Sequence, residues 1–461
     1  MIFASPIFLF WFLPFVLLAY CALPRQARNL LLLITSYVFY GWWRFDFAVL
    51  MVISSLVDFF AAQYIERPTT TQRRRKFALI ASLTANLGLL AYFKYANFGI
   101  ETLNALLEAA GHEPVRWMRV MLPVGISFYT FQTLSYTLDV YRGEVKATRD
   151  ILAFSTFVAL FPQLVAGPIV RYADIADQLK ERTITFDSIS RGAFLFIIGF
   201  EKKILLADIV APLADRVFAL SDPSTAEAWI GAFAYTLQLY FDFSGYSDMA
   251  IGLGLLIGFT FPINFDSPYK SESITEFWRR WHVSLSTWLR DYLYVPLGGN
   301  RMGPRRTYIN LALTMLLGGL WHGANWTFIV WGAWHGGLLA FERAIGKRPL
   351  YSGLPKPIRI GFTFVLVILG WIVFRAESIE SATTTWAALF GITERSGIRT
   401  HPNDLQWAVL GIGSILAFFA PTSQRLAQKP NFIWVLLALL FPVAILQLMF
   451  AHYSPFLYFQ F

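Results

Sequence analysis

The most regular feature of the chain is a series of long apolar stretches separated by short polar loops. A helix that crosses the ~30 Å hydrocarbon core of a bilayer needs about 20 apolar residues. About a dozen stretches reach or approach that length, at residues 6–24, 29–43, 46–65, 77–95, 120–141, 151–170, 192–213, 228–263, 308–321, 324–342, 358–374, 407–420 and 431–452. The pattern predicts an all-α polytopic membrane protein with about a dozen transmembrane or re-entrant helices.

Several of these stretches are interrupted by proline or glycine, as at Phe161-Pro162, Gly167-Pro168 and Pro262. Broken helices at membrane depth are tolerated where protein or a water-filled cavity covers the freed backbone groups. We therefore expect a cavity inside one integral membrane domain, residues 1–461. The sequence shows no internal repeat and no separate soluble domain.

The composition supports the bilayer as the solvent. Apolar residues make up 56% of the chain and charged residues 15%, compared with about 25% charged residues in soluble domains, and the mean hydropathy is +0.51. Nucleic acid is not an expected partner, because the Lys and Arg residues are scattered among loops and form no continuous basic face. Cys21 is the only cysteine, so neither an intrachain disulfide nor a multi-thiolate metal site is expected.

The basic residues also predict the orientation in the membrane. The first apolar stretch lacks the basic start and the small-residue cleavage site of a signal peptide, so we interpret it as a retained helix. Arg25 and Arg28 follow the first stretch, and residues 67–76 carry five basic residues after the third. Two crossings separate these loops, and basic loops favour the cytoplasm. We therefore expect an outward N-terminus, with the basic loop 266–306 also cytoplasmic.

Two histidines lie in apolar sequence, His322 in Trp321-His322-Gly323 and His335 in Trp334-His335-Gly336. Ionisable groups at bilayer depth are costly and often mark the working part of a membrane protein. A continuous helix would place two residues thirteen apart about 140° apart in projection, so only a break near Gly323 to Asn325 could bring them together. Each histidine could be a general base or a buried side chain bonded to a neighbouring helix.

Residues 276–292 carry apolar residues at helical spacing together with Arg279, Arg280 and Arg290. The pattern predicts an interfacial amphipathic helix, followed by a turn-rich stretch that includes Asn300 and Arg301. The arginines could bind the phosphates of an anionic donor such as acetyl-CoA. They could equally hold the helix against anionic lipid headgroups, and His282 could simply be interfacial.

Asp242 and Asp248 form a second ionisable pair at apparent membrane depth. They could orient a histidine or line a polar tunnel. Alternatively, they form interhelical hydrogen bonds, because Gly252, Gly254 and Gly258 follow at the spacing of close helix packing, with Gly254 and Gly258 four residues apart. The sequence contains no G-x-S-x-G elbow, no P-loop and no H-E-x-x-H motif, which disfavours hydrolase-type covalent catalysis and zinc chemistry.

The chain resembles the membrane-bound O-acyltransferase (MBOAT) family, and within it the membrane subunit type of bacterial alginate O-acetylation. The resemblance covers most of residues 1–375 and rests on Asn29 to Trp43, Tyr92 to Gly99, Leu122 to Tyr129, Ala166-Gly167-Pro168, Tyr240 to Gly254, Ile274 to Arg301 and Leu316 to His335. It weakens over 376–461, which we expect to add C-terminal helices. The membrane protein of lipoteichoic acid D-alanylation is a more distant relative.

The resemblance implies an MBOAT fold with a central tunnel, an acetyl-CoA donor, and no bound cofactor or metal. His322 matches the family's essential histidine, and Arg280-Trp281-His282 matches its cytoplasmic signature. The remaining candidates for donor binding or tunnel lining are Arg279, Asn300, Arg301, Trp321, Asp242, Asp248 and His335. The resemblance also implies a periplasmic or membrane-anchored SGNH-type acetyltransferase as partner, and the bacterial inner membrane as location.

The sequence leaves two alternatives open. Acetylation of cellulose or another exopolysaccharide would use a closely similar subunit, so the polymer is not determined, although overall similarity favours alginate. A secondary transporter would also suit broken helices and charges at midplane depth. Such a transporter is expected to show two related halves, and the sequence shows none.

Overall fold

A computed structural model shows helices and no strand among the residues it describes, which are 1–42, 44–346, 349–392, 395, 397–430, 432–450 and 457. Trp43, residues 451–452 at the end of the last predicted stretch, and the C-terminal segment apart from Leu457 lie outside this range. The chain divides into two compact units, residues 1–189 with 253–261, and residues 190–252 with 262–461. The prediction that residues 1–461 form one domain stays a prediction.

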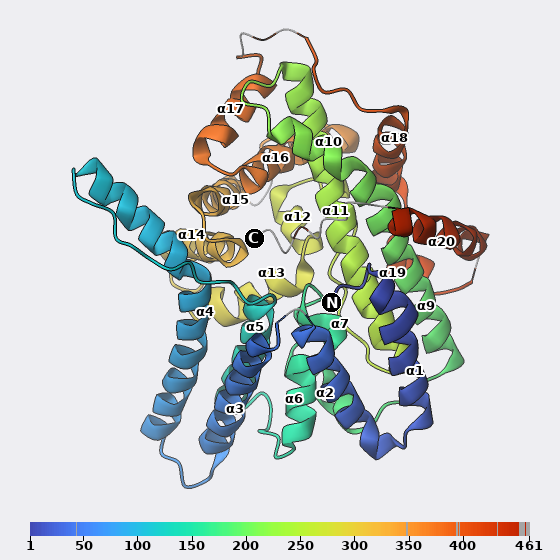
Figure 1. The fold of residues 1–461 in the computed structure, drawn as a ribbon. Coiled ribbons are helices and arrows are strands. Elements are labelled where there is room, and N and C mark those ends of the chain that lie inside the picture. The colour runs from blue at the N-terminus through green and yellow to red at the C-terminus, as the bar shows by residue number, and fades with distance from the viewer. Residues whose placement is uncertain are drawn as a thin grey trace. The chain divides into compact units, whose positions relative to one another are not determined.

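The first unit contains the N-terminal helices (Figure 1). They are η1 (Phe8–Phe12), α1 (Leu13–Ala22), α2 (Arg25–Gly41), α3 (Asp46–Glu66), α4 (Gln72–Ala109), α5 (Ile126–Arg142), α6 (Ile151–Ala159), α7 (Phe161–Leu164) and α8 (Tyr172–Lys180). The breaks predicted near Pro162 and Pro168 are confirmed, since α6 ends at Ala159 and the short α7 ends at Leu164.

A buried carboxylate joins three helices of this unit. Asp58 of α3 accepts hydrogen bonds from Asn86 of α4 and Thr137 of α5, both at 2.8 Å, and also from Ser82. Interhelical hydrogen bonds in membranes contribute about 0.6–2 kcal/mol each. The network therefore fixes how α3, α4 and α5 pack.

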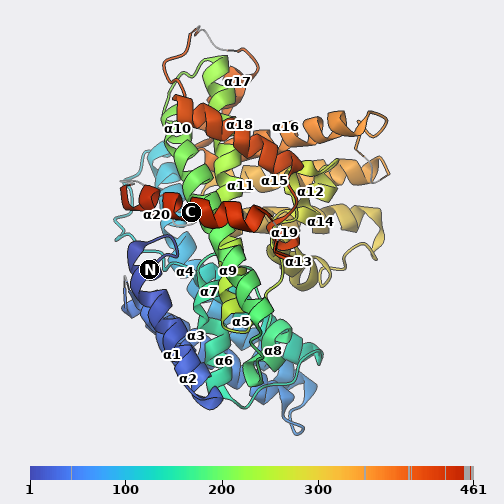
Figure 2. The same cartoon turned by 90° about the vertical axis from the view of Figure 1, so that its right-hand side faces the viewer.

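The second unit contains α9 (Phe186–Glu201), η2 (Lys202–Ala207), α10 (Asp208–Phe218), α11 (Thr225–Leu256), η3 (Pro268–Lys270), α12 (Ile274–Arg280), α13 (Val283–Leu289), η4 (Arg290–Tyr294), α14 (Gly303–His322), α15 (Trp326–Ala344), α16 (Lys356–Arg375), α17 (Ile379–Leu389), α18 (Asp404–Phe419), α19 (Ser423–Leu426) and α20 (Phe432–Phe450). α9 begins, and α11 ends, at residues of the first unit. Figure 2 shows α20 crossing beside α9 and α11, and α20 packs against η2.

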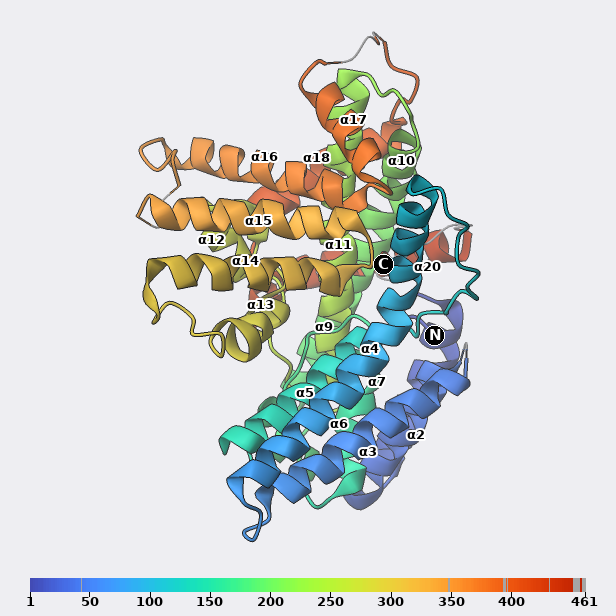
Figure 3. The ribbon, with the colours of Figure 1, turned by 90° about the vertical axis from the view of Figure 1, so that its left-hand side faces the viewer.

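Glycines set the closest helix contacts in the second unit. A Cβ on Gly199 of α9 would lie 2.4 Å from the carbonyl oxygen of Gly245 on α11, and one on Gly319 of α14 would lie 2.2 Å from that of Phe328. Figure 3 shows α14 and α15 side by side. Close packing is confirmed for Gly252, whose Cβ would lie 2.5 Å from the carbonyl oxygen of Gly192 on α9. The predicted pairing of Gly254 with Gly258 on one helix is wrong, because Gly258 lies beyond the end of α11, where its positive φ of 85° suits a turn.

Within the described part of the chain, four helices are long and apolar enough to cross a membrane, namely α3, α4, α16 and α20. Within the first unit, the α1–α2 and α3–α4 connections lie at the same end (Figures 1 and 2). The amino group of Met1 donates to the carbonyl oxygen of Phe39, near the end of α2. This arrangement matches the two crossings inferred between the basic loops.

The loop at Thr70 is expected to be cytoplasmic. In a Cys21→Ser background, Thr70→Cys should resist a membrane-impermeant thiol reagent in intact spheroplasts and react after lysis. Glu113→Cys, beyond the other end of α4, is the matched control and should react in both. Labelling of Thr70→Cys in intact spheroplasts would reverse the orientation.

The contact at Gly319 gives a stability prediction. Gly319→Ala should destabilise the protein by about 1–3 kcal/mol, because the added methyl group meets the α15 backbone. Gly337→Ala is the matched control, since nothing lies within 4 Å of its Cβ position. Thermal unfolding of the purified variants measures both effects. Equal melting temperatures for the two variants would show that the α14–α15 contact adapts without cost.

Candidate active site

His322 is the last residue of α14, and the helix ends there for a local reason. A Cβ on Gly323 would lie 1.9 Å from the Phe328 ring, so the chain can pass this point only with glycine. Asn325 then caps α15, its side chain accepting a hydrogen bond from the backbone of Thr327 at 3.0 Å. The chain therefore has, between the two histidines, the break that the sequence analysis gave as the condition for bringing them together.

Aromatic rings surround the His322 imidazole, which is 6% exposed. The ring centroids of Trp321, Trp331 and Phe374 lie 5.0, 5.1 and 5.3 Å from that of His322. The His282 ring lies 6.3 Å away, at a steep angle. The walls exclude bulk water and hold the imidazole in a fixed orientation.

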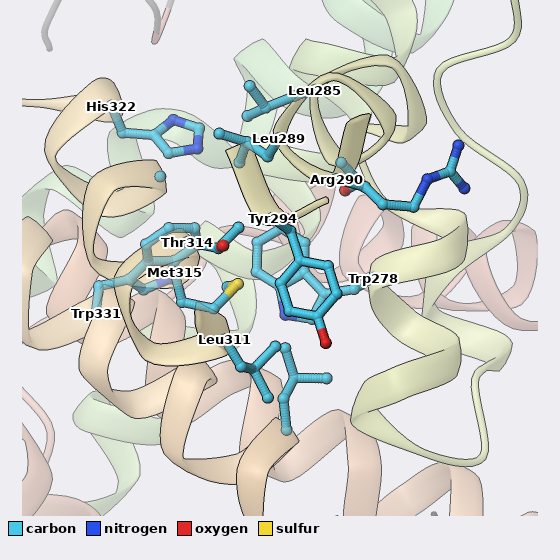
Figure 4. A pocket seen from close by; sticks show the side chains of 13 residues that line it. Trp278, Leu285, Leu289, Arg290, Tyr294, Leu311, Thr314, Met315, His322 and Trp331 are labelled. Atoms are coloured by element: carbon cyan, nitrogen blue, oxygen red, sulfur yellow. The ribbon is translucent and has the colours of Figure 1, made fainter. Parts of the chain in front are cut away.

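His322 lines two cavities. The larger, about 180 Å³, is bordered by α12, α13, η4, α14 and α15 and opens to the surface at Arg290. Its walls are Trp278, Leu285, Ser286, Leu289, Arg290, Tyr294, Leu311, Thr314, Met315, Gly318, His322, Trp331 and Leu339. In Figure 4 the imidazole points into this cavity, and Arg290 lies on the opposite side with its guanidinium directed away from the imidazole. The smaller, about 10 Å³, is lined by Leu239, Asp242, Phe243, Trp281, His322, Trp371, Phe374 and Leu457, and such a volume holds about one water.

Asp242 brings a buried charge to the smaller cavity. Its carboxylate lies 2.8 Å from the ammonium of Lys203, which also pairs with Asp208 at 2.5 Å. The backbone N–H of Leu457 donates to Asp242 at 3.3 Å. Asp248 lies elsewhere, against Lys202 at 2.7 Å. Asp242 and Asp248, which the sequence analysis treated as a pair, therefore bind different lysines, and of the two only Asp242 lines the smaller cavity.

His282 is held in one tautomer by Asn264. The backbone N–H and hydroxyl of Ser284 both donate to the Asn264 side-chain oxygen, at 3.2 and 2.9 Å. This identifies the oxygen, because a backbone N–H can only donate. The His282 Nδ1 atom, 3.1 Å from the same oxygen, must then carry the hydrogen. His282 is fully buried, so it is not an interfacial side chain.

The prediction of one amphipathic helix over 276–292 is wrong. α12 ends at Arg280, Trp281 is extended, and His282 has a positive φ of 44° before α13 begins. The cause is tertiary, since the carbonyl oxygen of Asn264 accepts from the backbone of Val283 at 2.9 Å. The break turns Trp281 inward, where its ring lies 4.8 Å from that of Trp371.

The predicted donor-binding residues are not all at this site. Arg280 pairs with Glu276 at 2.7 Å, while Arg279, Asn300 and Arg301 are exposed and line neither cavity beside His322. Arg290, which the sequence did not distinguish from Arg279 and Arg280, is the arginine that lines the larger cavity. Arg290 reaches this position because the helix breaks at Trp281 and His282, and the spacing of residues in the sequence does not reveal that break.

His335 is close to the site without lining either cavity beside His322. Its ring is fully buried, with centroids 5.1 Å from Trp331 and 5.2 Å from Trp278. Trp331 lies on α15 one turn before His335, and its ring contacts both His335 and His322. Trp321 also packs against His322 and is 3% exposed. His335 therefore packs against Trp331, on which the His322 ring also packs, and supports the position of that tryptophan.

Comparison with known proteins identifies similar sequences along the whole chain. Residues 142–349 match the family model described as "MBOAT, membrane-bound O-acyltransferase family". The chain is 49% identical to the "Probable alginate O-acetylase AlgI" of Pseudomonas putida, with 100% of both chains covered. It is 35% identical to the "Peptidoglycan O-acetyltransferase" of Helicobacter pylori, over 100% of this chain and 98% of that one.

A more distant similarity is to the "Teichoic acid D-alanyltransferase" of Streptococcus thermophilus, 30% identical over 54% of this chain and 68% of that one. With its apolar helices and these matches, the chain is an integral membrane protein and an O-acyltransferase. It belongs to the membrane-bound O-acyltransferase family.

Proposed function

We propose that the protein transfers acetyl groups from acetyl-CoA, at the cytoplasmic side of the bacterial inner membrane, to an acceptor reached through the protein. The observation that carries this proposal is the position of His322 between two cavities. One cavity extends toward Arg290 and the other toward Asp242. A donor and an acceptor could therefore approach the same imidazole from different sides.

In this proposal His322 is the general base. Its imidazole accepts the proton of the acceptor hydroxyl as the oxygen attacks the thioester carbonyl. The new C–O bond forms as the C–S bond breaks, and the CoA thiolate leaves and takes up the proton from the imidazolium. A base must lie about 2.6–3.2 Å from the hydroxyl oxygen for this transfer.

Arg290 would position the donor. It lies across the cavity from His322 (Figure 4), and its guanidinium pairs with Asp291 at 2.6 Å at an exposed surface. A guanidinium binds phosphate oxygens through paired N–H donors. The phosphates of CoA would then remain at the surface, while the thioester reaches into the apolar cavity.

The polymer we favour is alginate, because relatives aligned over their full length carry that name. Another cell-surface polymer is the alternative, since a peptidoglycan O-acetyltransferase is also similar along its length. Loss of acetyl groups from alginate alone, after deletion of the gene, would distinguish the two. Family membership favours acyl transfer over the transporter considered from the sequence.

The remaining proposals concern the path of the acetyl group. About a dozen helices would surround a tunnel that passes His322, and the acetyl group would leave on the outer side. A periplasmic or membrane-anchored SGNH-type transferase would then complete the reaction on the polymer. The absence of a G-x-S-x-G motif in this chain is compatible with such a division of work.

Replacement of His322 tests the proposal directly. His322→Ala should lower polymer acetylation by a factor of roughly 10² to 10⁴, the usual value of general-base assistance, while the protein still inserts into the membrane. Acetyl content of the secreted polymer, divided by the amount of membrane-inserted protein, gives the result. Near-normal acetylation would contradict the catalytic role.

His335→Ala is the comparison for this variant. It should leave a cavity among aromatic rings and lower stability by about 2–4 kcal/mol, with less than tenfold loss of activity per folded molecule. If His335→Ala lowered activity per molecule as much as His322→Ala, the two histidines would have to act together.

Arg290 gives a separate prediction for the donor. Arg290→Ala should raise the KM for acetyl-CoA about tenfold or more with a smaller change in kcat, because a charge-assisted contact to phosphate is removed. Arg305→Ala, which changes an exposed arginine outside both cavities, is the matched control. An unchanged KM for Arg290→Ala would place the donor elsewhere.

A further inference from the structure

A separate cavity of about 420 Å³ lies in the second unit, bordered by α9, η2, α11, α18, α19 and α20. Its volume is in the range of sites that bind small molecules, about 300–1,000 Å³. Most of its wall is apolar and includes Leu205, Leu206, Leu416, Leu436 and Leu440. A hydrocarbon chain is the ligand that such walls fit.

The wall made by α20 places this cavity beside lipid. α20 is a candidate membrane span, and few of its residues are buried inside the protein. Leu436 and Leu440 line the cavity, while Leu439 and Val443 are 70% and 50% exposed. A lipid of the surrounding bilayer could therefore reach the cavity along α20.

One part of the cavity is polar. The Lys202 ammonium donates to Asp248 and to Ser423, both at 2.7 Å, and Gln424 donates to Asp248 at 2.7 Å. An ammonium has three N–H donors, and these two contacts leave one for a ligand. The positive charge of Lys202 is balanced by the negative charge of Asp248.

Glu201 and Ser244 also line this cavity, and they are 5% and 2% exposed. Neither oxygen of the Glu201 carboxyl, nor the Ser244 hydroxyl, has a hydrogen-bond partner within the described part of the chain. Buried polar groups are nearly always hydrogen-bonded in folded proteins. The close approach of Gly199 and Gly245 brings these two side chains to the same wall.

We propose that this cavity binds one phospholipid with a primary ammonium headgroup, phosphatidylethanolamine in chemical class. The lipid ammonium would donate to the Glu201 carboxylate and the Ser244 hydroxyl, its phosphate would accept from Lys202, and an acyl chain would lie along the leucines. Lys202 pairs with Asp248 and not with Glu201, so the lipid ammonium would supply the positive charge that stabilises a Glu201 carboxylate. A choline headgroup has no N–H to donate, and a glycerol headgroup brings no positive charge.

The lipid site is separate from the proposed chemistry, because neither Glu201 nor Lys202 lines the cavities beside His322. Binding can therefore be measured on the full-length protein in detergent, without an activity assay. Native mass spectrometry would compare phosphatidylethanolamine, phosphatidylglycerol and phosphatidylcholine with identical acyl chains. The wild-type protein should retain phosphatidylethanolamine about tenfold more tightly than either of the others.

Glu201→Gln should remove this preference by lowering phosphatidylethanolamine binding about tenfold or more, because the charged acceptor is lost. Glu181→Gln, whose carboxylate is at an exposed surface, is the matched control and should bind like wild type. Equal binding of the three lipids by wild type, or an unchanged preference in a folded Glu201→Gln, would overturn the proposal.

Leu440→Trp tests whether the lipid occupies this cavity. The larger side chain, at a partly exposed position, should lower the binding of all three lipids while the protein stays folded by thermal unfolding. Glu201→Gln thus tests the preference for the headgroup, and Leu440→Trp tests separately whether the lipid lies in this cavity. Undiminished phosphatidylethanolamine binding in this variant would place the lipid elsewhere and refute the assignment.

Discussion

The arrangement at His322 depends on the close contact between α14 and α15. Helices in a bilayer gain little from the hydrophobic effect against one another, so they associate through tight packing at small residues. Gly319 and Gly332 supply that packing, since a Cβ on Gly332 would lie 2.5 Å from the carbonyl oxygen of Met315. This contact fixes Trp331 of α15 against His322 of α14, and the turn at Gly323 leaves the imidazole facing the cavities.

Buried charge is the second constraint on the fold, and pairing reduces its cost. Lys203 of η2 pairs with Asp208 of α10 and with Asp242 of α11. Removing one partner of a buried ion pair is strongly destabilising, by about 3–5 kcal/mol, so these pairs hold the three segments together. Asp242 and Asp248 are six residues apart on α11, hence about 120° apart in projection. One helix therefore presents a carboxylate to the cavity beside His322 and another to the proposed lipid site.

The basic segment shows how tertiary contacts change a local pattern. The helical spacing of apolar residues over 276–292 is real, yet Asn264 bonds to the backbone and ring at 282–284 and divides the helix. The division sends Trp281 and His282 into the core, leaves Arg279 exposed, and places Arg290 on the cavity. An arginine that is equivalent to its neighbours by sequence thus becomes distinct by position.

The sequence by itself determined the helical class, the apolar segments, the breaks at Pro162 and near Gly323, and the family, because these follow from hydropathy, backbone stereochemistry and long motifs. It also singled out His322. Only the tertiary structure decided that His322 lies between two cavities, that His335 belongs to the packing behind it, and that Asp242 and Asp248 are separated. Those features arise from contacts between residues far apart in the chain, such as Lys203 with Asp242, or Phe374 with His322, which no local pattern encodes.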